Sequence, residues 1–497
     1  MLQPSSSSGG SGGNGVGARA PVPGDGTPTA SATLALARFG TRTGLALIIL
    51  VAAVLVAYAN ALSASYQFDD FAAILAHPSA RSLAGWWHAL PGIRPLLKLG
   101  YALTFDLGGG AVAIHATNIA IHAANACLLW ALWRRWLPRL APSLGRVEAA
   151  AWLAAVLFAL HPAATEAVTY ASGRSISLAA TFVLAAVLAD DVARERPSRR
   201  ALAWIGPVLF ALALAVRETA LVMPAIPLLR AWARGDPLRA TLRSLWPYAL
   251  VLAAAALAAI ATPGYHVFFG VSLSTRSLAG QAMGQLLAHA YLITHSLAGA
   301  TNIDPDLRVP AAWSGTLSAS LLLLATLVAT MLAARRRLPW LAFAIGWYFL
   351  QLAPANSLLP RLDLANDRHV YLALAGPMLA LACVFARAAG RAHGRVPAGV
   401  AACMLCATFA VATWKRNADY RSEVALWQAT VRDSPRKARA WLNLGYAYRL
   451  DGDAPRAAGA YRCALALDPA NAQALIDLDL VAPGDTTPAT CAAATVE

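Results

Sequence analysis

Charged residues are scarce in this sequence, and acidic residues are scarcer than basic ones. Asp, Glu, Lys and Arg make up only 13% of the 497 residues, whereas 58% are hydrophobic, compared with about 45–50% in a soluble domain. One water-soluble core cannot bury that excess, which lies in uncharged blocks such as 44–61, 247–261 and 318–334. Such blocks approach or reach the roughly 17–25 residues that cross a bilayer as a helix. The composition therefore predicts an all-α, polytopic membrane protein.

Motifs of soluble enzymes are missing as well. Beyond the Gly/Ser-rich first 35 residues the chain has no Walker loop, G-x-G-x-x-G, H-E-x-x-H or G-x-S-x-G motif, so nucleotide-driven and soluble-hydrolase chemistry have no support. Most of the six cysteines fall inside apolar blocks, and we expect neither a disulfide framework nor a metal site from them. The net charge of +15 comes from arginines between apolar blocks, which predicts membrane topology rather than nucleic-acid binding.

The positions of the arginines predict how the chain crosses the membrane. Arginine clusters recur at every second connection, as expected for cytoplasmic loops, whereas segments 65–111, 161–174 and 217–218 contain few basic residues and belong outside. Residues 282–300 contain Gln and His, which favours an amphipathic helix in the outer interface. We expect about eleven spans, a cytoplasmic N-terminus and an outer C-terminus.

Composition divides the chain into four parts. Residues 1–40 are predicted to be a disordered cytoplasmic tail, residues 41–414 the membrane domain, and residues 486–497 a second disordered tail. The first apolar block begins about 40 residues from the start, which favours a retained span over a cleaved signal peptide. Residues 415–485 are predicted to form a short repeat module.

That module is predicted from a W-x2-L-G-x2-Y pattern. The pattern is typical of the first helix of a tetratricopeptide repeat, and small residues and a proline follow where its second helix should lie. The residues concerned are Trp441, Leu444, Gly445, Tyr448, Ala457, Tyr461, Ala464 and Pro469, and Pro435 stands one repeat length of about 34 residues before Pro469.

Charged residues at the outer ends of spans are the candidates for chemistry. Asp69 and Asp70 are adjacent at the membrane edge, where repulsion and lost hydration should raise at least one pKa. They could act as a general base on a hydroxyl or hold a divalent cation such as Mg²⁺ or Mn²⁺, and the alternative is a solvated helix cap. Glu166 could line a cavity or pair with Arg174, and Glu218 could pair with its neighbour Arg217.

Arginines and histidines complete the candidate set. Arg368 and Arg94 could each contact a lipid phosphate or serve as an interfacial anchor. His115 and His122 lie seven residues apart on one helical face, where they could line a polar cavity or hydrogen-bond neighbouring helices. His161 precedes the Glu166 cluster, and His369 and Tyr371 follow Arg368.

In combination these motifs resemble one known family. The residues that carry the resemblance are Phe68, Asp69, Asp70, Ile74 and Pro78; Arg94, Pro95 and Leu96; His115, Asn118 and His122; residues 157–168 with Gly173 and Arg174; Arg217 and Glu218; Asp367, Arg368, His369 and Tyr371; and the repeat pattern. They resemble the transmembrane and tetratricopeptide-repeat-containing O-mannosyltransferases and their bacterial relatives. This chain has Asp367-Arg368 where the family has Glu-Arg, Arg217-Glu218 where it has Lys-Glu, and a shorter tail.

The resemblance implies a C-type glycosyltransferase fold and transfer of a sugar from a polyprenyl-phosphate carrier. By carry-over, Asp69 and Asp70 would activate the acceptor, Arg368 would lie near the carrier phosphate, and Glu166 and Arg174 would line the cavity. Arg94, Arg174 and Tyr371 would join the donor-phosphate site. Polar residues of the cavity would be His161, Glu218, His115 and His369.

The sequence thus predicts a polytopic glycosyltransferase of a bacterial inner membrane, with its repeat module in the periplasm. Its partners would be a polyprenyl-phosphate-sugar donor, a protein or envelope-glycan acceptor and membrane lipids, with no nucleic acid. The alternatives are a non-catalytic membrane scaffold whose repeats recruit partners, and a transporter with polar residues lining its path.

Overall fold

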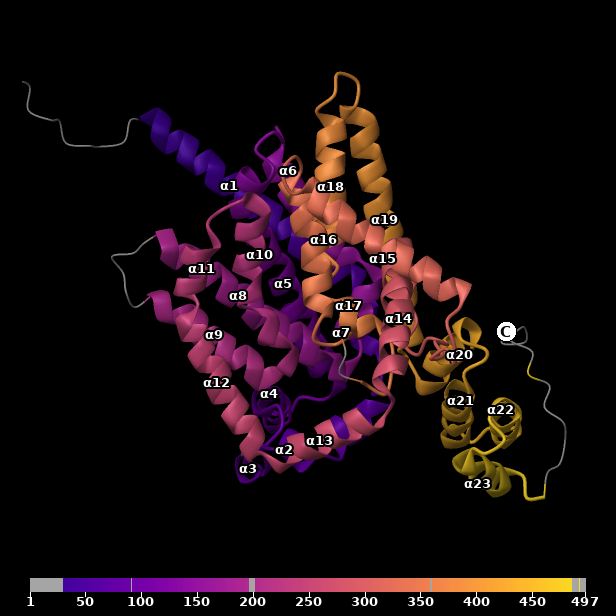
Figure 1. Ribbon diagram of the computed structural model, residues 1–497. Coiled ribbons are helices and arrows are strands. Elements are labelled where there is room, and N and C mark those ends of the chain that lie inside the picture. The colour runs from indigo at the N-terminus through magenta and orange to yellow at the C-terminus, as the bar shows by residue number, and fades with distance from the viewer. Residues whose placement is uncertain (1–29, 91, 196–201, 358–359, 485–490, 492–497) are drawn as a thin grey trace, which may run out of the picture. The chain divides into compact units, whose positions relative to one another are not determined.

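The computed structural model describes residues 30–90, 92–195, 202–357, 360–484 and Cys491. Within these ranges the chain forms helices and connecting turns, and no strand (Figure 1), so the predicted all-α class is confirmed there. Contacts divide the chain into two units, Met1–Ala46 and Leu47–Glu497, of which the second holds all the sites discussed below. Residues 30–40, predicted to belong to a disordered tail, form the start of α1 (Ala30–Ala57).

Six helices pack together as the core of the second unit. The closely packed pairs among them include α8 with α9, α6 with α18 and α5 with α6. Their large buried side chains include Trp133 on α5 and Phe343 and Trp347 on α16, which meet edge to face. The helices are α5 (Ala111–Leu140), α6 (Val147–Leu160), α8 (Arg174–Glu195), α9 (Leu202–Val216), α16 (Pro339–Leu352) and α18 (Ala375–Ala389).

Other helices surround this core or connect its members. Those that lie between α9 and α16 in the sequence are α10 (Ala225–Arg234), α11 (Leu238–Ser244), α12 (Trp246–Ala261), α13 (Pro263–Ser274), α14 (Leu278–Ala298) and α15 (Gly315–Ala334), and α19 (Arg395–Asp419) follows α18. The segment 59–106 holds η1 (Ala59–Ser63), η2 (Phe71–Leu75), α2 (Pro78–Arg81), α3 (Leu83–His88) and α4 (Pro95–Asp106). Short connecting turns are η3 (Pro162–Ala164), α7 (Thr165–Val168), η4 (Ala171–Gly173), η5 (Glu218–Val222) and α17 (Asp367–Val370).

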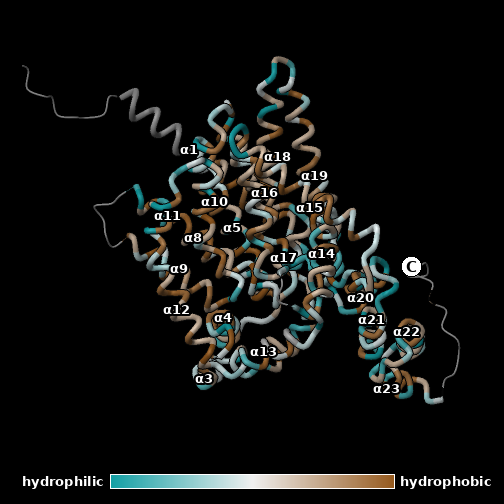
Figure 2. The backbone as a smooth tube through the Cα atoms, in the orientation of Figure 1, coloured by the Kyte–Doolittle hydropathy of each residue, from teal (hydrophilic) through white to brown (hydrophobic). Residues whose placement is uncertain are grey.

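Several helices have the length and composition of membrane spans. Among the described residues four qualify, namely Ala111–Leu140, Ala171–Glu195, Gly315–Ala334 and Arg395–Asp419, and two bent helix pairs could raise the number to six. Shorter apolar helices occur at Arg42–Ala57, Leu202–Val216 and Ala375–Ala389. Figure 2 shows apolar residues running along α9 and α12. The chain is therefore a helical membrane protein, and the count of about eleven spans stays a prediction.

One bent pair positions a candidate residue. Helix α6 ends at Leu160, and the chain turns by 59° before η3 and α7 continue. Pro162 lacks an N–H and disfavours a helical conformation at the residue before it, and His161 is accordingly extended, with φ −70° and ψ 126°. The Nδ1 atom of His161 accepts the N–H of Ala163. The break thereby places Glu166 on α7, where it meets α17.

The C-terminal segment folds as a stack of helices over its own core. These are α20 (Glu423–Asp433), α21 (Ala438–Leu450), α22 (Ala454–Leu467) and α23 (Ala472–Val481). A Cβ on Gly445 would lie 2.6 Å from the ring of Tyr461, so the small residue allows α21 and α22 to approach closely. Helices stand where the repeat pattern predicts them, while the name tetratricopeptide repeat stays a prediction.

One cysteine prediction is wrong. Cys463 on α22 forms a disulfide with Cys491, although no disulfide framework was expected. The expectation rested on cysteines inside apolar spans, and both of these lie beyond the last one. Cys403 and Cys406 are free thiols on α19.

Candidate functional site

The two adjacent carboxylates of the first loop have opposite environments. The side chain of Asp70 is fully buried, and its two oxygens accept the N–H groups of Gln67 at 2.9 Å and Ser172 at 2.8 Å. Burial raises the pKa of Asp70 to about 7, against the lowering effect of these hydrogen bonds. The side chain of Asp69, in contrast, is 45% exposed. Asp70 thus joins the first loop to η4, whereas the side chain of Asp69 stays partly exposed beside Arg368.

Arg368 brings together carboxylates from distant parts of the chain. Its Nη1 lies 3.6 Å from Oδ2 of Asp69, and its Nε lies 3.6 Å from Oε1 of Glu166. The backbone N–H of Arg368 donates to Oε2 of Glu166 at 2.9 Å. Residues 69, 166 and 368, all predicted site residues, therefore meet in one cluster, although nearly 300 positions separate the first from the last.

Several polar atoms in this cluster have no hydrogen-bond partner within the described residues. They are Oε1 of Glu166, Nε of Arg368 and Nδ1 of His369, and a separation of 3.6 Å is too long for a hydrogen bond. Because buried polar groups are normally paired, these atoms indicate a place that a ligand or water would complete.

Further arginines lie close to Arg368. The guanidinium of Arg217 is buried and donates to the Ser175 hydroxyl at 2.7 Å. Burial, followed by the charges of Arg94, Arg361 and Arg368, lowers the pKa of Arg217 well below its usual range. Like charges gathered in this way repel one another. The arrangement favours an anionic ligand that would neutralise them.

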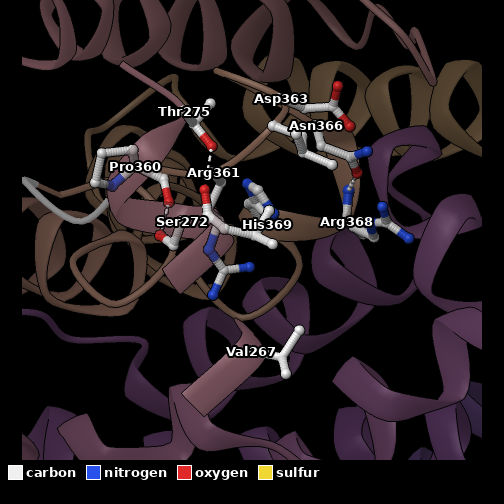
Figure 3. Close-up of a pocket in the computed structure, with 11 residues that line it drawn as sticks. Val267, Ser272, Thr275, Pro360, Arg361, Asp363, Asn366, Arg368 and His369 are labelled. Carbon is white, nitrogen blue, oxygen red and sulfur yellow. Dashed lines mark hydrogen bonds between the residues drawn. The ribbon is translucent and has the colours of Figure 1, made fainter. Parts of the chain in front are cut away.

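Two cavities open beside these arginines and share Arg368 and His369 in their walls. The larger has a volume of about 390 Å³ and lies between α13 and segment 360–369, with Arg361, Arg368 and His369 on one side and Val267 on the other (Figure 3). The smaller, of about 50 Å³, is lined by Arg217. Burial and the three guanidinium groups of Arg361, Arg368 and Arg217 lower the pKa of His369, so its ring is neutral.

Arg94 and Glu218, two predicted site residues, bind each other. Arg94 Nη2 lies 2.8 Å from Glu218 Oε2, and the Tyr265 hydroxyl donates to Glu218 Oε1 at 3.0 Å. Burial favours a raised pKa for Glu218, but the charge of Arg94 outweighs it and lowers the value to about 2. Arg94 has φ +53° and precedes Pro95, and such backbone strain often accompanies functional sites.

Other predicted residues lie inside the helix bundle instead. Arg174 is buried and donates to Asn118 Oδ1 at 2.7 Å and to the carbonyls of Ile114 at 3.0 Å and Gly100 at 3.4 Å. The Tyr371 hydroxyl is 2.8 Å from His122 Nδ1 and accepts from Asn125 at 3.0 Å. His115 is buried on α5, and His161 packs against Phe409. The structure does not bring these side chains to the two cavities.

The residues present do not form a complete metal-binding cage. Among the described residues no group of three or more His, Cys, Asp and Glu side chains is arranged around a common point. The oxygens of Asp70 are occupied by backbone N–H groups, which leaves Asp69 as the exposed carboxylate of the pair. A divalent cation here would need ligands from the substrate, as Mg²⁺ commonly takes them from phosphates.

The loop that carries Asp69 is held by residues at the start of the C-terminal helices. The sequence did not indicate this contact. Phe68 has φ +36°, a strained value for a bulky residue. Its N–H donates to Glu423 Oε1 at 2.8 Å, and its ring meets Trp427 edge to face at 5.3 Å between centroids. The carbonyl of Tyr420 accepts the N–H of Ser65 at 3.1 Å. We call these contacts of Tyr420, Glu423 and Trp427 the α20 brace.

Fold and site together define a helical membrane protein with a charged cluster drawn from several interhelical segments. Among curated proteins the chain is similar to Protein O-mannosyl-transferase Tmtc1 of Drosophila melanogaster, with 32% identity over 140 residues. It is also similar to Protein O-mannosyl-transferase TMTC3 of Mus musculus, with 29% identity over 181 residues, and to TMTC4 of Homo sapiens, with 29% over 159 residues.

These similarities are partial. They cover 25%, 33% and 28% of this chain and 15%, 18% and 22% of the three relatives, in the order given, so the matched part spans less than a quarter of each relative. No protein-family model matches the chain, and no solved structure matches it.

Proposed function

We propose that this chain is a membrane glycosyltransferase that moves a hexose such as mannose from a polyprenyl-phosphate carrier to a hydroxyl of a protein or envelope glycan. The observation that carries the proposal is the cluster of Asp69, Glu166 and Arg368 beside two cavities lined by arginines. The names of the partly matching relatives support transfer of mannose to oxygen.

The donor phosphate fits the arginine-lined cavities by charge. Arg361, Arg368 and Arg217 would neutralise it, and guanidinium groups suit phosphate oxygens because they donate two parallel hydrogen bonds. Val267 and Val271 of α13 are exposed and line the larger cavity. They offer an apolar surface for the first units of a polyprenyl chain.

The transfer step needs a base on the acceptor and a stabilised leaving group. The acceptor hydroxyl oxygen would bond to the anomeric carbon while the bond from that carbon to the phosphate oxygen breaks, and polyprenyl phosphate leaves. Asp69 would take the hydroxyl proton, and the arginines would stabilise the charge on the departing phosphate. Glu166 would position Arg368 through its backbone N–H and side chain, and Asp70 would position the Asp69 loop.

The location follows from the same proposal. The charged cluster and the C-terminal module would lie on the periplasmic side of a bacterial inner membrane, with the N-terminus in the cytoplasm and the module acting as a short tetratricopeptide array. The disulfide between Cys463 and Cys491 supports this side for the module, because disulfides persist in oxidising compartments.

Transfer of labelled hexose from polyprenyl phosphate by the purified protein in nanodiscs tests the proposal. Turnover that is lost in Asp69→Asn, and kept in Arg421→Ala as a surface control, is the expected result. Undiminished turnover in Asp69→Asn would count against the assigned site.

A scaffold without catalysis is the second candidate. Leu475, Ile476 and Leu480 on α23 are exposed, and exposed apolar groups of this kind are typical of surfaces that bind partners. If the chain is a scaffold, removing these side chains should abolish partner binding. If it is the proposed transferase, the same variant should keep its sugar transfer in vitro.

A further inference from the structure

A separate polar cavity lies where the last candidate span meets the C-terminal helices. Its volume is about 680 Å³, and its walls come from Pro162, the end of α14 with residues 299–302, the end of α19, and the end of α20. None of its lining residues belongs to the two arginine-lined cavities described above. The backbone N–H of Asn302, which lines it, donates to Asp367 Oδ2 at 2.6 Å, and Asp367 is the neighbour of Arg368 on α17.

The charged lining of this cavity suits a phosphate. Lys415, Arg416 and Arg432 line it together with Asp419 and Asp433. Arg416 is only 6% exposed, and its Nη1 donates to Asp419 at 3.0 Å. Its Nε has no hydrogen-bond partner within the described residues. A buried guanidinium with an unused donor favours an anionic oxygen as its missing partner.

An apolar surface leads along α19 to the cavity. Val400, Met404, Val411 and Lys415 follow one another at intervals of four, seven and four residues, so they share one side of the helix. The three apolar members are 53–65% exposed. Leu297 at the end of α14 is also exposed. A free anion would gain nothing from this surface, whereas the acyl chains of a lipid would cover it.

The position of this cavity along α19 fits the level of lipid headgroups. Helix α19 is a candidate span of 25 residues, and exposed Trp414 and Lys415 lie near its C-terminal end. Tryptophan concentrates at the membrane–water interface, and Lys side chains near helix ends reach for the same level. The phosphates of membrane lipids lie there too.

We propose that this cavity binds the phosphate of a membrane phospholipid, whose acyl chains lie along the exposed side of α19. Lys415 and Arg432 contact the phosphate from the rim, and Arg416, whose side chain lines the cavity, contributes its positive charge from within. Because α14, α19 and α20 all contribute, the bound lipid would join the last span to the C-terminal module. This proposal does not depend on the proposed sugar transfer.

Native mass spectrometry of the delipidated protein in detergent tests it. The protein is mixed with phosphatidylethanolamine, with diacylglycerol that lacks the phosphate, or with sn-glycerol 3-phosphate that lacks the chains. The wild type should retain one phosphatidylethanolamine molecule, and the double variant Lys415→Ala, Arg432→Ala should retain it at least about a hundredfold less well, because it lacks two charged contacts. Arg421→Ala removes a nearby surface charge outside the cavity and should bind as the wild type does.

Three results would overturn the proposal. They are equal retention of diacylglycerol, binding of sn-glycerol 3-phosphate as tight as that of the phospholipid, and unchanged retention in the double variant. Lys415 and Arg432 are exposed, so circular dichroism should show the double variant folded. The assay uses no sugar donor, so its outcome is independent of catalysis.

Discussion

Two arginines of this molecule have different surroundings. Arg174, inside the helix bundle, donates to a side-chain amide and to backbone carbonyls of the neighbouring helices, and its guanidinium covers the ring of Tyr101 at 4.5 Å. Arg368, on α17, lies 3.6 Å from the carboxylates of Asp69 and Glu166 and near other arginines, and its Nε lacks a hydrogen bond within the described residues.

The difference distinguishes an arginine that stabilises the fold from one that belongs to the candidate site. A buried charge whose donors are all satisfied by the fold stabilises that fold, whereas gathered like charges with unused donors cost stability unless a ligand completes them. We therefore assign Arg174 to the architecture and Arg368 to the site, although both had been predicted to serve the donor or its cavity.

The largest effect is expected in the bundle. Replacing Arg174 with Met should destabilise the protein by about 3–5 kcal/mol, because the amide of Asn118 and the carbonyls of Gly100 and Ile114 would lose their donor. Thermal unfolding in detergent measures it. A folded Arg174→Met protein with normal stability and impaired donor binding would reverse the assignment.

The next effect concerns catalysis without loss of fold. Asp69→Asn should lower turnover by about 10²–10⁴-fold, the usual contribution of a general base, with little change in unfolding temperature because Asp69 is half exposed.

Asp70→Asn should instead lower stability by about 1–3 kcal/mol, since an amide nitrogen would face a backbone N–H. Turnover and unfolding measured on both variants separate the two roles, and identical behaviour of the pair would refute them.

Replacing Arg361 should weaken binding of the donor and leave binding of the acceptor unchanged. Removing one charged contact to a phosphate, as in Arg361→Ala, should raise the KM for the polyprenyl-phosphate sugar by about 10–100-fold and leave the KM for the acceptor unchanged. Arg421→Ala serves as the control at the surface. If both KM values rose together, the arginine-lined cavity would not be a donor-specific site.

A smaller effect is expected from the α20 brace. Glu423→Ala removes the acceptor of the Phe68 N–H, while Glu423→Gln keeps an oxygen there. Because such a hydrogen bond contributes about 1 kcal/mol, Ala should lower kcat about fivefold and Gln should restore most of it. The KM for the donor should stay constant. Asp453→Ala in the same module is the control, and equal losses in Ala and Gln variants would exclude this role.

A further effect is a dependence of stability on pH. The pKa of Asp70 is about 4 in the unfolded chain and about 7 in the fold, so between these values the folded state binds more protons. The stabilisation that protonated Asp70 gives the fold is therefore lost as pH rises from about 4 to 7. Above pH 7 this group causes no further change in stability. The difference in unfolding temperature between the wild type and Asp70→Asn should shrink from pH 5 to pH 8. A difference that grows would contradict the raised pKa.

Much of the charged cluster could be predicted from the sequence because charges are rare in the segments predicted to lie outside the membrane. Asp69, Glu166 and Arg368 were singled out for that reason, and the fold brings them together. Arg361 was missed, since nothing local distinguishes it from an arginine that sets topology. Arginines are scarce in the segments predicted to lie outside the membrane, and that scarcity was the signal that could have revealed Arg361.

Contacts between distant segments could not be predicted. Whether Tyr371 faces a cavity or a neighbouring helix depends on a partner about 250 positions earlier, His122. The disulfide prediction was wrong because an argument about spans says nothing of Cys463 and Cys491, which lie beyond them. Short apolar helices such as α9 also make the number of spans hard to count from hydropathy alone.

The α20 brace has a consequence for biosynthesis. Residues 65–68 are held by residues 420–427, and some 350 positions lie between them. A ribosome must therefore have made nearly the whole chain before the loop bearing Asp69 can settle. Until then the early helices can already have folded, while the loop that carries Asp69 still lacks the contacts that hold it.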